Sequence, residues 1–203
     1  MESKTLNDLR QIIRRSMSDI VFCDQDILDL EDNFRLIHKI PKGGKLSETL
    51  RQMRRDLIDF RRRNYIKTVF SSFEAIIWGM KNILLEQKQL IKAPKLLIEL
   101  QGFKLEGPNK KNLTKKPMKT GLEKSIKVTI NAFDTFILKG KSHNIFSSDE
   151  WEKFKNAIKI RDRITHPKSP KDLKVSVKEL ELVRDCYYWF FNLTAIKRIP
   201  KSL

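Results

Sequence analysis

The sequence has few of the residues that build disulfide-rich, zinc-binding or collagen-like proteins. Its 203 residues include two cysteines, Cys23 and Cys186, which lie far apart and outside any CxxC or Cys/His cluster. This spacing offers neither a zinc framework nor a disulfide scaffold. Glycine and proline occur seven times each, too rarely for a collagen-like or low-complexity chain.

Long apolar runs and the common cofactor motifs are also missing. No run approaches the about 18 apolar residues of a membrane span, and residues 1–16 carry charges where a secretory signal needs an apolar core. We therefore expect a soluble, cytoplasmic protein without a membrane partner. GxxxxGK, GxGxxG and a His/carboxylate ligand set are absent, so the sequence gives no support for a cofactor or a metal.

Acidic residues are outnumbered, with 25 Asp and Glu against 42 Lys and Arg, which gives a formal net charge of +17. Twelve Phe, three Trp and three Tyr are too many large apolar residues for a disordered chain. Residues 1–50 are nearly neutral, and the surplus belongs to the remainder. These features predict a folded domain that faces a polyanion, with a lysine-rich solubilising surface as the alternative.

Apolar residues recur with helical spacing along nearly the whole chain. Two apolar stripes within residues 4–39 predict a helical hairpin, so that an N-terminal hairpin at about 1–45 precedes a core at about 47–199. Ser47 is expected to cap a long stretch that forms one helix or two. Residues 101–120, which are rich in lysine, glycine and proline, predict a long basic loop.

Three capping boxes predict the later helices, at residues 120–139, 148–166 and 177–199. The boxes pair a hydroxyl with a glutamate three residues on: Thr120 with Glu123, Ser147 with Glu150, and Ser176 with Glu179. Because no strand pair with hairpin turn chemistry is found, the predicted fold is all-α, an antiparallel helical bundle in a single domain over residues 1–203.

The second of these helices ends in charged residues that are suited to chemistry on phosphate. Its apolar stripe predicts Arg161 and Asp162 on the core-facing line, and His166 follows Asp162 by four residues, so that the two side chains are neighbours on a helix. Pro167 is expected to end the helix at His166. Asp162 and the helix dipole favour an imidazole that exchanges a proton, and the Arg161 guanidinium fork suits phosphate.

The string RDRITHP, residues 161–167, resembles the Arg-polar-x3-His signature of the HEPN superfamily (higher eukaryotes and prokaryotes nucleotide-binding domains). The earlier string FSSFEAIIWGM, with Glu74 on an apolar helix, is similar to the second-helix segment of such domains, where an acidic residue often approaches the arginine. The resemblance extends over residues 47–199 in the order of the helices.

This resemblance implies a helical bundle, a homodimer that joins two motifs across its interface, and metal-independent RNA cleavage. It implies His166 as general acid or base, Arg161 as phosphate stabiliser, Asp162 as the residue that orients the pair, and Glu74 as a supporting partner. It also implies a toxin or antiphage-defence effector with an antitoxin or sensor protein. Lys168 occupies the position of the tyrosine found in members controlled by nucleotidylation, so such control is not expected.

Structural roles are the alternative for each of these residues. Arg161 and Asp162 would then form a buried ion pair, and His166 would cap the helix. Glu74 lies between two aromatic residues one turn away on either side, so its carboxylate is expected to be partly desolvated unless a cation, such as an arginine, meets it. The other histidines, His38 and His143, have no partners at metal or triad spacing.

Basic residues outside the motif are candidates for contacts with the RNA backbone. Four arginines share one long helix, two lysines belong to the basic loop, and two further residues adjoin the motif; the alternative for the arginines is pairing with nearby aspartates. The loop lacks interleaved aromatics, so it does not support base-specific recognition. The candidates are Arg51, Arg54, Arg55, Arg62, Lys115, Lys116, Arg163 and Lys168.

The last helix contains CYYWFFNL at residues 186–193 and is apolar on more than one side, which predicts a core helix with or without a dimer contact.

Two functions follow from the sequence. The first is a HEPN-like, metal-independent endoribonuclease that acts as a homodimer. The second is a non-catalytic helical adaptor that binds RNA or a partner protein through its basic face and apolar C-terminal helix.

Overall fold

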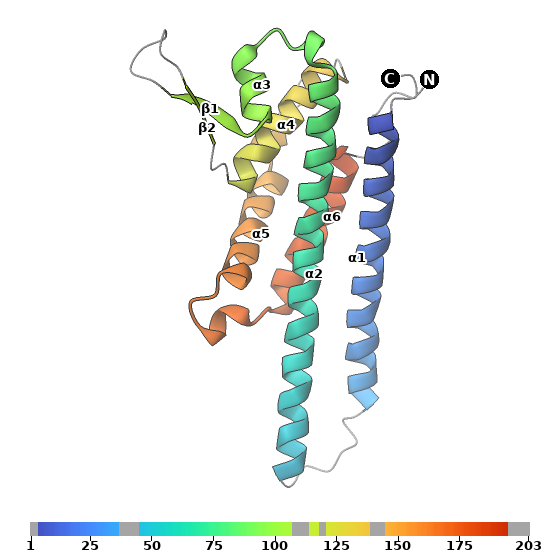
Figure 1. Ribbon diagram of the computed structural model, residues 1–203. Coiled ribbons are helices and arrows are strands. Elements are labelled where there is room, and N and C mark those ends of the chain that lie inside the picture. The colour runs from blue at the N-terminus through green and yellow to red at the C-terminus, as the bar shows by residue number, and fades with distance from the viewer. Residues whose placement is uncertain (1–3, 37–44, 107–113, 118–120, 139–144, 195–203) are drawn as a thin grey trace.

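A computed structural model of the chain describes residues 4–36, 45–106, 114–117, 121–138 and 145–194, and within them the protein is an all-α bundle, as predicted. The longest helix, α2, runs through the middle of the molecule (Figure 1). The six α-helices of the described residues are α1 (Lys4–Leu36), α2 (Lys45–Glu86), α3 (Pro94–Leu100), α4 (Leu122–Phe136), α5 (Asp149–Thr165) and α6 (Val177–Thr194).

The N-terminal segment is one continuous helix, so the prediction of a hairpin within residues 4–39 was wrong. No glycine or proline interrupts Lys4–Leu36. Ile20 and Ile27 are both buried and lie seven residues apart, which places them on one face, so the two stripes are a single stripe. The antiparallel partner of α1 is α2, which is one helix that begins two residues before Ser47 (Figure 1).

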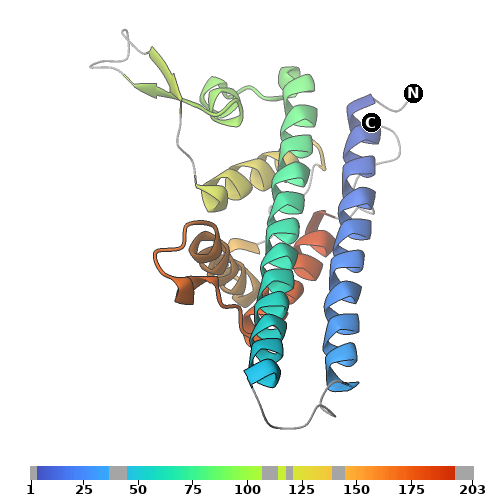
Figure 2. The same ribbon diagram turned by 60° about the horizontal axis from the view of Figure 1, so that its bottom comes forward.

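Helix α2 is the element against which the rest of the bundle packs. It contacts α1, α4, α5 and α6, and Figure 2 shows α1 on one side of it and α4 and α5 on the other. At Gly79 a Cβ atom would lie 2.7 Å from Leu9 Cδ1, so the absence of a side chain allows α1 and α2 to approach closely.

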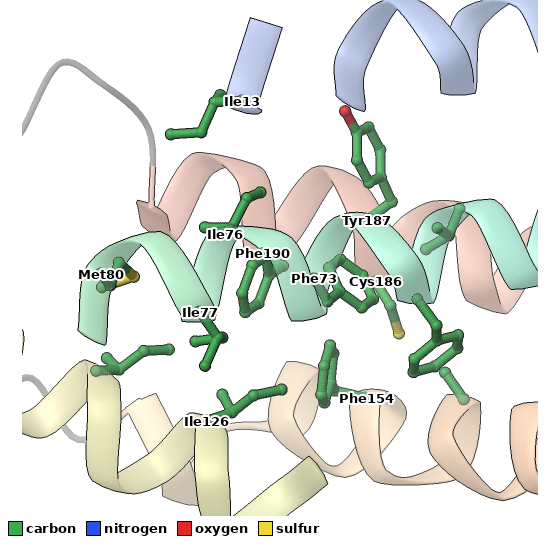
Figure 3. Close-up of a cluster of buried hydrophobic side chains, with 14 of the residues drawn as sticks. Ile13, Phe73, Ile76, Ile77, Met80, Ile126, Phe154, Cys186, Tyr187 and Phe190 are labelled. Atoms are coloured by element: carbon green, nitrogen blue, oxygen red, sulfur yellow. The ribbon is translucent and has the colours of Figure 1, made fainter. Parts of the chain in front are cut away.

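An aromatic cluster joins α2, α5 and α6 in the core (Figure 3). Phe73 of α2 is fully buried, and its ring centroid lies 5.1 Å from that of Phe154 and 4.5 Å from that of Phe190. Tyr187 adds a stacked contact at 6.3 Å. The predicted apolar face of the last helix is therefore largely core: Leu180, Val183, Cys186, Tyr187 and Phe190 are buried.

A polar network of Asp24, Tyr65 and Arg184 connects α1, α2 and α6. Arg184 of α6 donates to Asp24 of α1 through Nη2, and through Nε at 3.1 Å. The hydroxyl of buried Tyr65 interacts with the same guanidinium, and burial, reinforced by the Asp24 charge, raises the pKa of Tyr65. The network thus adds a polar link between α1 and α6 to the apolar packing of α1 against α2.

We expect Asp24→Ala to lower the free energy of unfolding by about 1.5–3 kcal/mol, because a charge-assisted hydrogen bond is lost and Arg184 remains partly buried. Asp29→Ala is the matched control, since Asp29 lies exposed on the same helix and accepts from Gln25, four residues earlier. Urea unfolding followed by circular dichroism measures both. Equal stabilities of the two variants would contradict a structural role for the network.

The structure confirms one of the three capping boxes and changes two. Ser176 Oγ accepts from the Glu179 amide, and the Glu179 carboxylate accepts from the Ser176 amide. The cap of α5 is Ser148, one residue after the predicted Ser147, because adjacent serines offer the same hydroxyl. Gly121 is the cap of α4. The predicted cap Thr120 lies outside the described residues, as do the predicted helix ends at residues 139 and 199.

Residues 101–120 contain a short β-ribbon where the sequence predicted only a loop. Strands β1 (Phe103–Glu106) and β2 (Thr114–Pro117) pair antiparallel, with Phe103 opposite Pro117. Gly102 precedes β1 with a φ of +82°, a conformation that favours glycine. Strand β1 alternates apolar and polar residues over only four positions, and β2 has no such alternation, so the sequence signal for a strand pair is weak and the pairing itself reveals it.

Candidate functional site

The centre of the site is an arginine on α5 that two carboxylates hold at the protein surface. Arg161 forms an ion pair with Glu74 of α2 through Nη2, and Nη1 lies 2.9 Å from Asp162 Oδ1. The guanidinium also lies over the Phe70 ring, 5.9 Å from its centroid. The structure thus brings three of the four predicted catalytic residues, Arg161, Asp162 and Glu74, into contact.

This cluster lies at the rim of the core, which differs from one expectation. The buried stripe of α5 continues through Ile160 and Ile164, so Arg161 and Asp162 flank the core-facing line instead of occupying it. Of the two alternatives for Glu74, the structure has the one in which an arginine meets the carboxylate. The Glu74 side chain is 49% exposed and that of Arg161 26%, so the ion pair is not fully buried.

His166 ends α5 as predicted. Its amide donates to the Asp162 carbonyl at 2.9 Å, and its ψ of 61° leaves the helical region immediately before Pro167. The side chain is exposed and has no hydrogen-bond or ion-pair partner within the part of the chain that the structure describes. Asp162 binds Arg161 instead, so in this structure it orients the arginine and not the histidine.

The segment after His166 is a well-anchored turn. Asp172 accepts from the Lys168 and Ser169 amides, at 2.8 Å each, and these bonds, Lys168 first, lower the pKa of Asp172. Arg163 donates to the carbonyls of Asp172 and Lys174 and to the Glu179 carboxylate. The histidine is thereby held between a helix end and a rigid turn.

Two predicted RNA contacts serve this turn instead. Arg163 makes the internal bonds just described, and Arg62 of α2 donates to the Val175 carbonyl at 3.0 Å. Arg63, which the sequence analysis did not single out, donates to the Leu173 carbonyl at 2.8 Å. Because these guanidinium groups bind backbone carbonyls of the chain itself, we assign Arg62 and Arg163 structural roles and omit them from the proposed RNA surface.

The remaining basic candidates lie in separate places. Arg51, Arg54 and Arg55 are on the first half of α2, while Lys115 and Lys116 are on β2 toward the opposite end of that helix (Figure 1). Arg55 donates to Gln52, which in turn donates to Asp56, so the expected arginine–aspartate pairing is indirect here.

The basic surface nearest the motif is a group of four lysines, of which the sequence analysis named only Lys168. The turn after His166 and the start of α6 carry exposed lysines, and their spacing of three residues through KSPKDLK was the available signal. These lysines are Lys168, Lys171, Lys174 and Lys178. They provide positive charge at the end of α5 that carries the histidine.

The described ranges contain neither a candidate membrane span nor a candidate metal site. No helix there combines the length and apolar character needed to cross a bilayer. Nor do three or more His, Cys, Asp or Glu side chains in these ranges gather as ligands for a metal ion.

The fold and the site define an all-α protein with a surface arginine that two carboxylates hold, next to a helix end that carries an exposed histidine. Comparisons of the chain with protein-family models, with curated proteins and with solved structures find no match.

Proposed function

We propose that the protein is a metal-independent endoribonuclease of the HEPN type, in which Arg161 binds the scissile phosphate and His166 transfers a proton. The observation that supports this most is the pairing of Arg161 with Glu74 and Asp162 on the helix that ends at exposed His166. The cluster sits where RNA can reach it, since Glu74, Asp162 and His166 are all exposed.

Arg161 is held ready to bind phosphate. A guanidinium has five N–H donors, of which Glu74 and Asp162 engage one nitrogen each, and the Phe70 ring supports its face. The two carboxylates place a net negative charge on the trio, so an incoming phosphate displaces one of them. The lysines of the turn after His166 supply compensating positive charge.

His166 provides the acid–base chemistry. The ribose 2′-oxygen attacks the adjacent phosphorus, the bond to the 5′-oxygen breaks, and a 2′,3′-cyclic phosphate remains. One imidazole accepts the 2′-hydroxyl proton or donates a proton to the departing 5′-oxygen.

Because a single chain offers one such histidine, we propose a homodimer in which two motifs face one RNA strand. A role as a toxin or antiphage-defence effector in the cytoplasm, controlled by an antitoxin or sensor protein, belongs to the same proposal.

A non-catalytic adaptor is the second candidate, and an exposed apolar stripe favours it. Leu50, Met53, Leu57 and Phe60 follow one another at spacings of three and four along the first half of α2, and each is at least 38% exposed. Such a stripe is suited to a partner helix. This function predicts binding without strand scission.

The proposed function is tested by incubating purified protein with total RNA and tRNA in EDTA and analysing the ends on a denaturing gel. We expect cleavage to cyclic-phosphate ends, and a loss of about 10²–10³-fold in rate for Arg161→Ala, because a preorganised donor to the phosphate is removed. Arg161→Lys should also lose rate, since it keeps the charge without the planar fork.

The matched control is Arg15→Ala, which removes an exposed arginine of α1. Wild-type cleavage by Arg161→Ala would refute the proposed role of this residue. Intact RNA in every lane, with a salt-dependent shift in a native gel, would favour the adaptor.

A further inference from the structure

The most exposed tryptophan of the chain lies one helical turn from the Glu74–Arg161 pair. Trp78 of α2 is 60% exposed, whereas Trp151 is fully buried and Trp189 is packed against the core. Residues four apart on a helix share a face, about 6 Å apart along the axis, so the indole borders the carboxylate that holds Arg161. A large aromatic ring is therefore presented to solvent beside the proposed phosphate site.

The surroundings of Trp78 on α2 are mostly polar. Glu74 precedes it by four residues, and Lys81 and Asn82 follow by three and four. Lys81 is partly buried and donates to Ser125 Oγ at 2.8 Å, which directs its amine toward the start of α4. Lys81 therefore joins α2 to α4, and the charged groups nearest to Trp78 along the α2 face are those of the Glu74–Arg161 pair.

We propose that Trp78 is a stacking platform for a nucleobase of single-stranded RNA, next to the phosphate bound by Arg161. A π-face accepts any base, and a flanking cation meets the backbone, which is the arrangement that single-strand binding uses. Trp78 and Glu74 are separated by about 6 Å along the helix axis, so the indole lies one helical turn from the carboxylate that binds Arg161, on the same face of α2.

A nucleobase fits this position better than another protein surface does. The fully buried core of a protein interface is more apolar than the rest of the surface, as the stripe on the first half of α2 is, whereas Trp78 has charged or amide groups at three of its four helical neighbours. The inference rests on the proposed function for the position of the phosphate, and it adds the substrate class: single-stranded segments with an unstacked base.

The probe is a 5′-fluorescein RNA hexamer with 2′-O-methyl groups, which cannot be cleaved by 2′-oxygen attack, together with an abasic version of it. Fluorescence anisotropy gives the affinity of both for the wild type and for Trp78→Ala, Trp78→Phe and Tyr188→Ala. Tyr188 is the matched control, an aromatic residue of α6 that is 52% exposed. Circular dichroism checks the fold of each variant.

We expect Trp78→Ala to bind the base-containing hexamer about tenfold more weakly, while Trp78→Phe and Tyr188→Ala stay within about twofold of the wild type. The abasic hexamer should bind the wild type and Trp78→Ala equally. Unlabelled hexamer should quench the tryptophan emission of the wild type more than that of Trp78→Phe.

The stacking role would be overturned if Trp78→Ala bound the base-containing hexamer as tightly as the wild type does. It would also be overturned if sedimentation showed that Trp78→Ala changes the oligomeric state, because Trp78 would then be a contact between copies of the chain. The two proposals fail separately. Cleavage that persists with no effect of Trp78→Ala overturns the platform alone, whereas Trp78-dependent binding without any cleavage overturns the nuclease and keeps the platform.

Discussion

Replacing His166 by alanine is expected to slow RNA cleavage by about 10²–10⁴-fold, the range that a positioned general acid or base contributes. The imidazole is exposed and has no partner among the residues that the structure describes. The backbone amide of residue 166 donates a hydrogen bond to the Asp162 carbonyl, and alanine retains this bond. The free energy of unfolding should therefore change by less than about 0.5 kcal/mol. The loss of rate would then report chemistry and not folding.

The measurement is a single-turnover cleavage rate in EDTA, with hexamer affinity recorded in parallel. His143→Ala is the matched control, because it removes another histidine from the same chain. Imidazole added to the buffer should partly restore the His166→Ala rate if proton transfer is what was lost. Cleavage by His166→Ala at the wild-type rate would exclude the histidine from the mechanism.

Phe73→Ala should produce the largest loss of stability, about 3–5 kcal/mol in the free energy of unfolding. The ring is fully buried and contacts Phe70 at 5.3 Å as well as Phe154, Tyr187 and Phe190, so its removal leaves a cavity where three helices meet. Small domains have about 5–15 kcal/mol in total. The variant is therefore expected to unfold at much lower urea concentration.

Phe60→Ala provides the control for this change on the same helix. Phe60 is 48% exposed, so its truncation should alter the free energy of unfolding by no more than about 0.5 kcal/mol in the monomer. Urea unfolding at two protein concentrations measures both variants. A Phe73→Ala protein as stable as Phe60→Ala would show that the aromatic cluster is not the centre of the core.

The helical elements were largely predictable because helix formation depends on local spacing. Neighbouring residues of each apolar stripe in the later helices are one helical turn apart, as are Ser176 and Glu179 of the capping box. The structure contains all three of those helices, α4, α5 and α6. The hairpin predicted within residues 4–39 failed because one seven-residue interval, from Ile20 to Ile27, was interpreted as a break, although both residues occupy one face.

The candidate site was predictable only where its residues are near in sequence or where the resemblance supplied the pairing. Arg161, Asp162 and His166 lie within six residues, and their order around the end of α5 follows from helix geometry and Pro167. The role of Arg163 was not predictable, because its carbonyl partners come from a turn whose path depends on Asp172 and Glu179.

The sequence by itself determined an all-α chain, the positions of the helices α4, α5 and α6, and a helix that ends at His166, because these depend on spacing and capping within a few residues. Only the tertiary structure decided that Arg62 binds a backbone carbonyl 113 residues away and that Trp78 stays exposed. Contacts across such distances depend on how helices pack as whole bodies, and the packing of apolar faces is not encoded in any one segment.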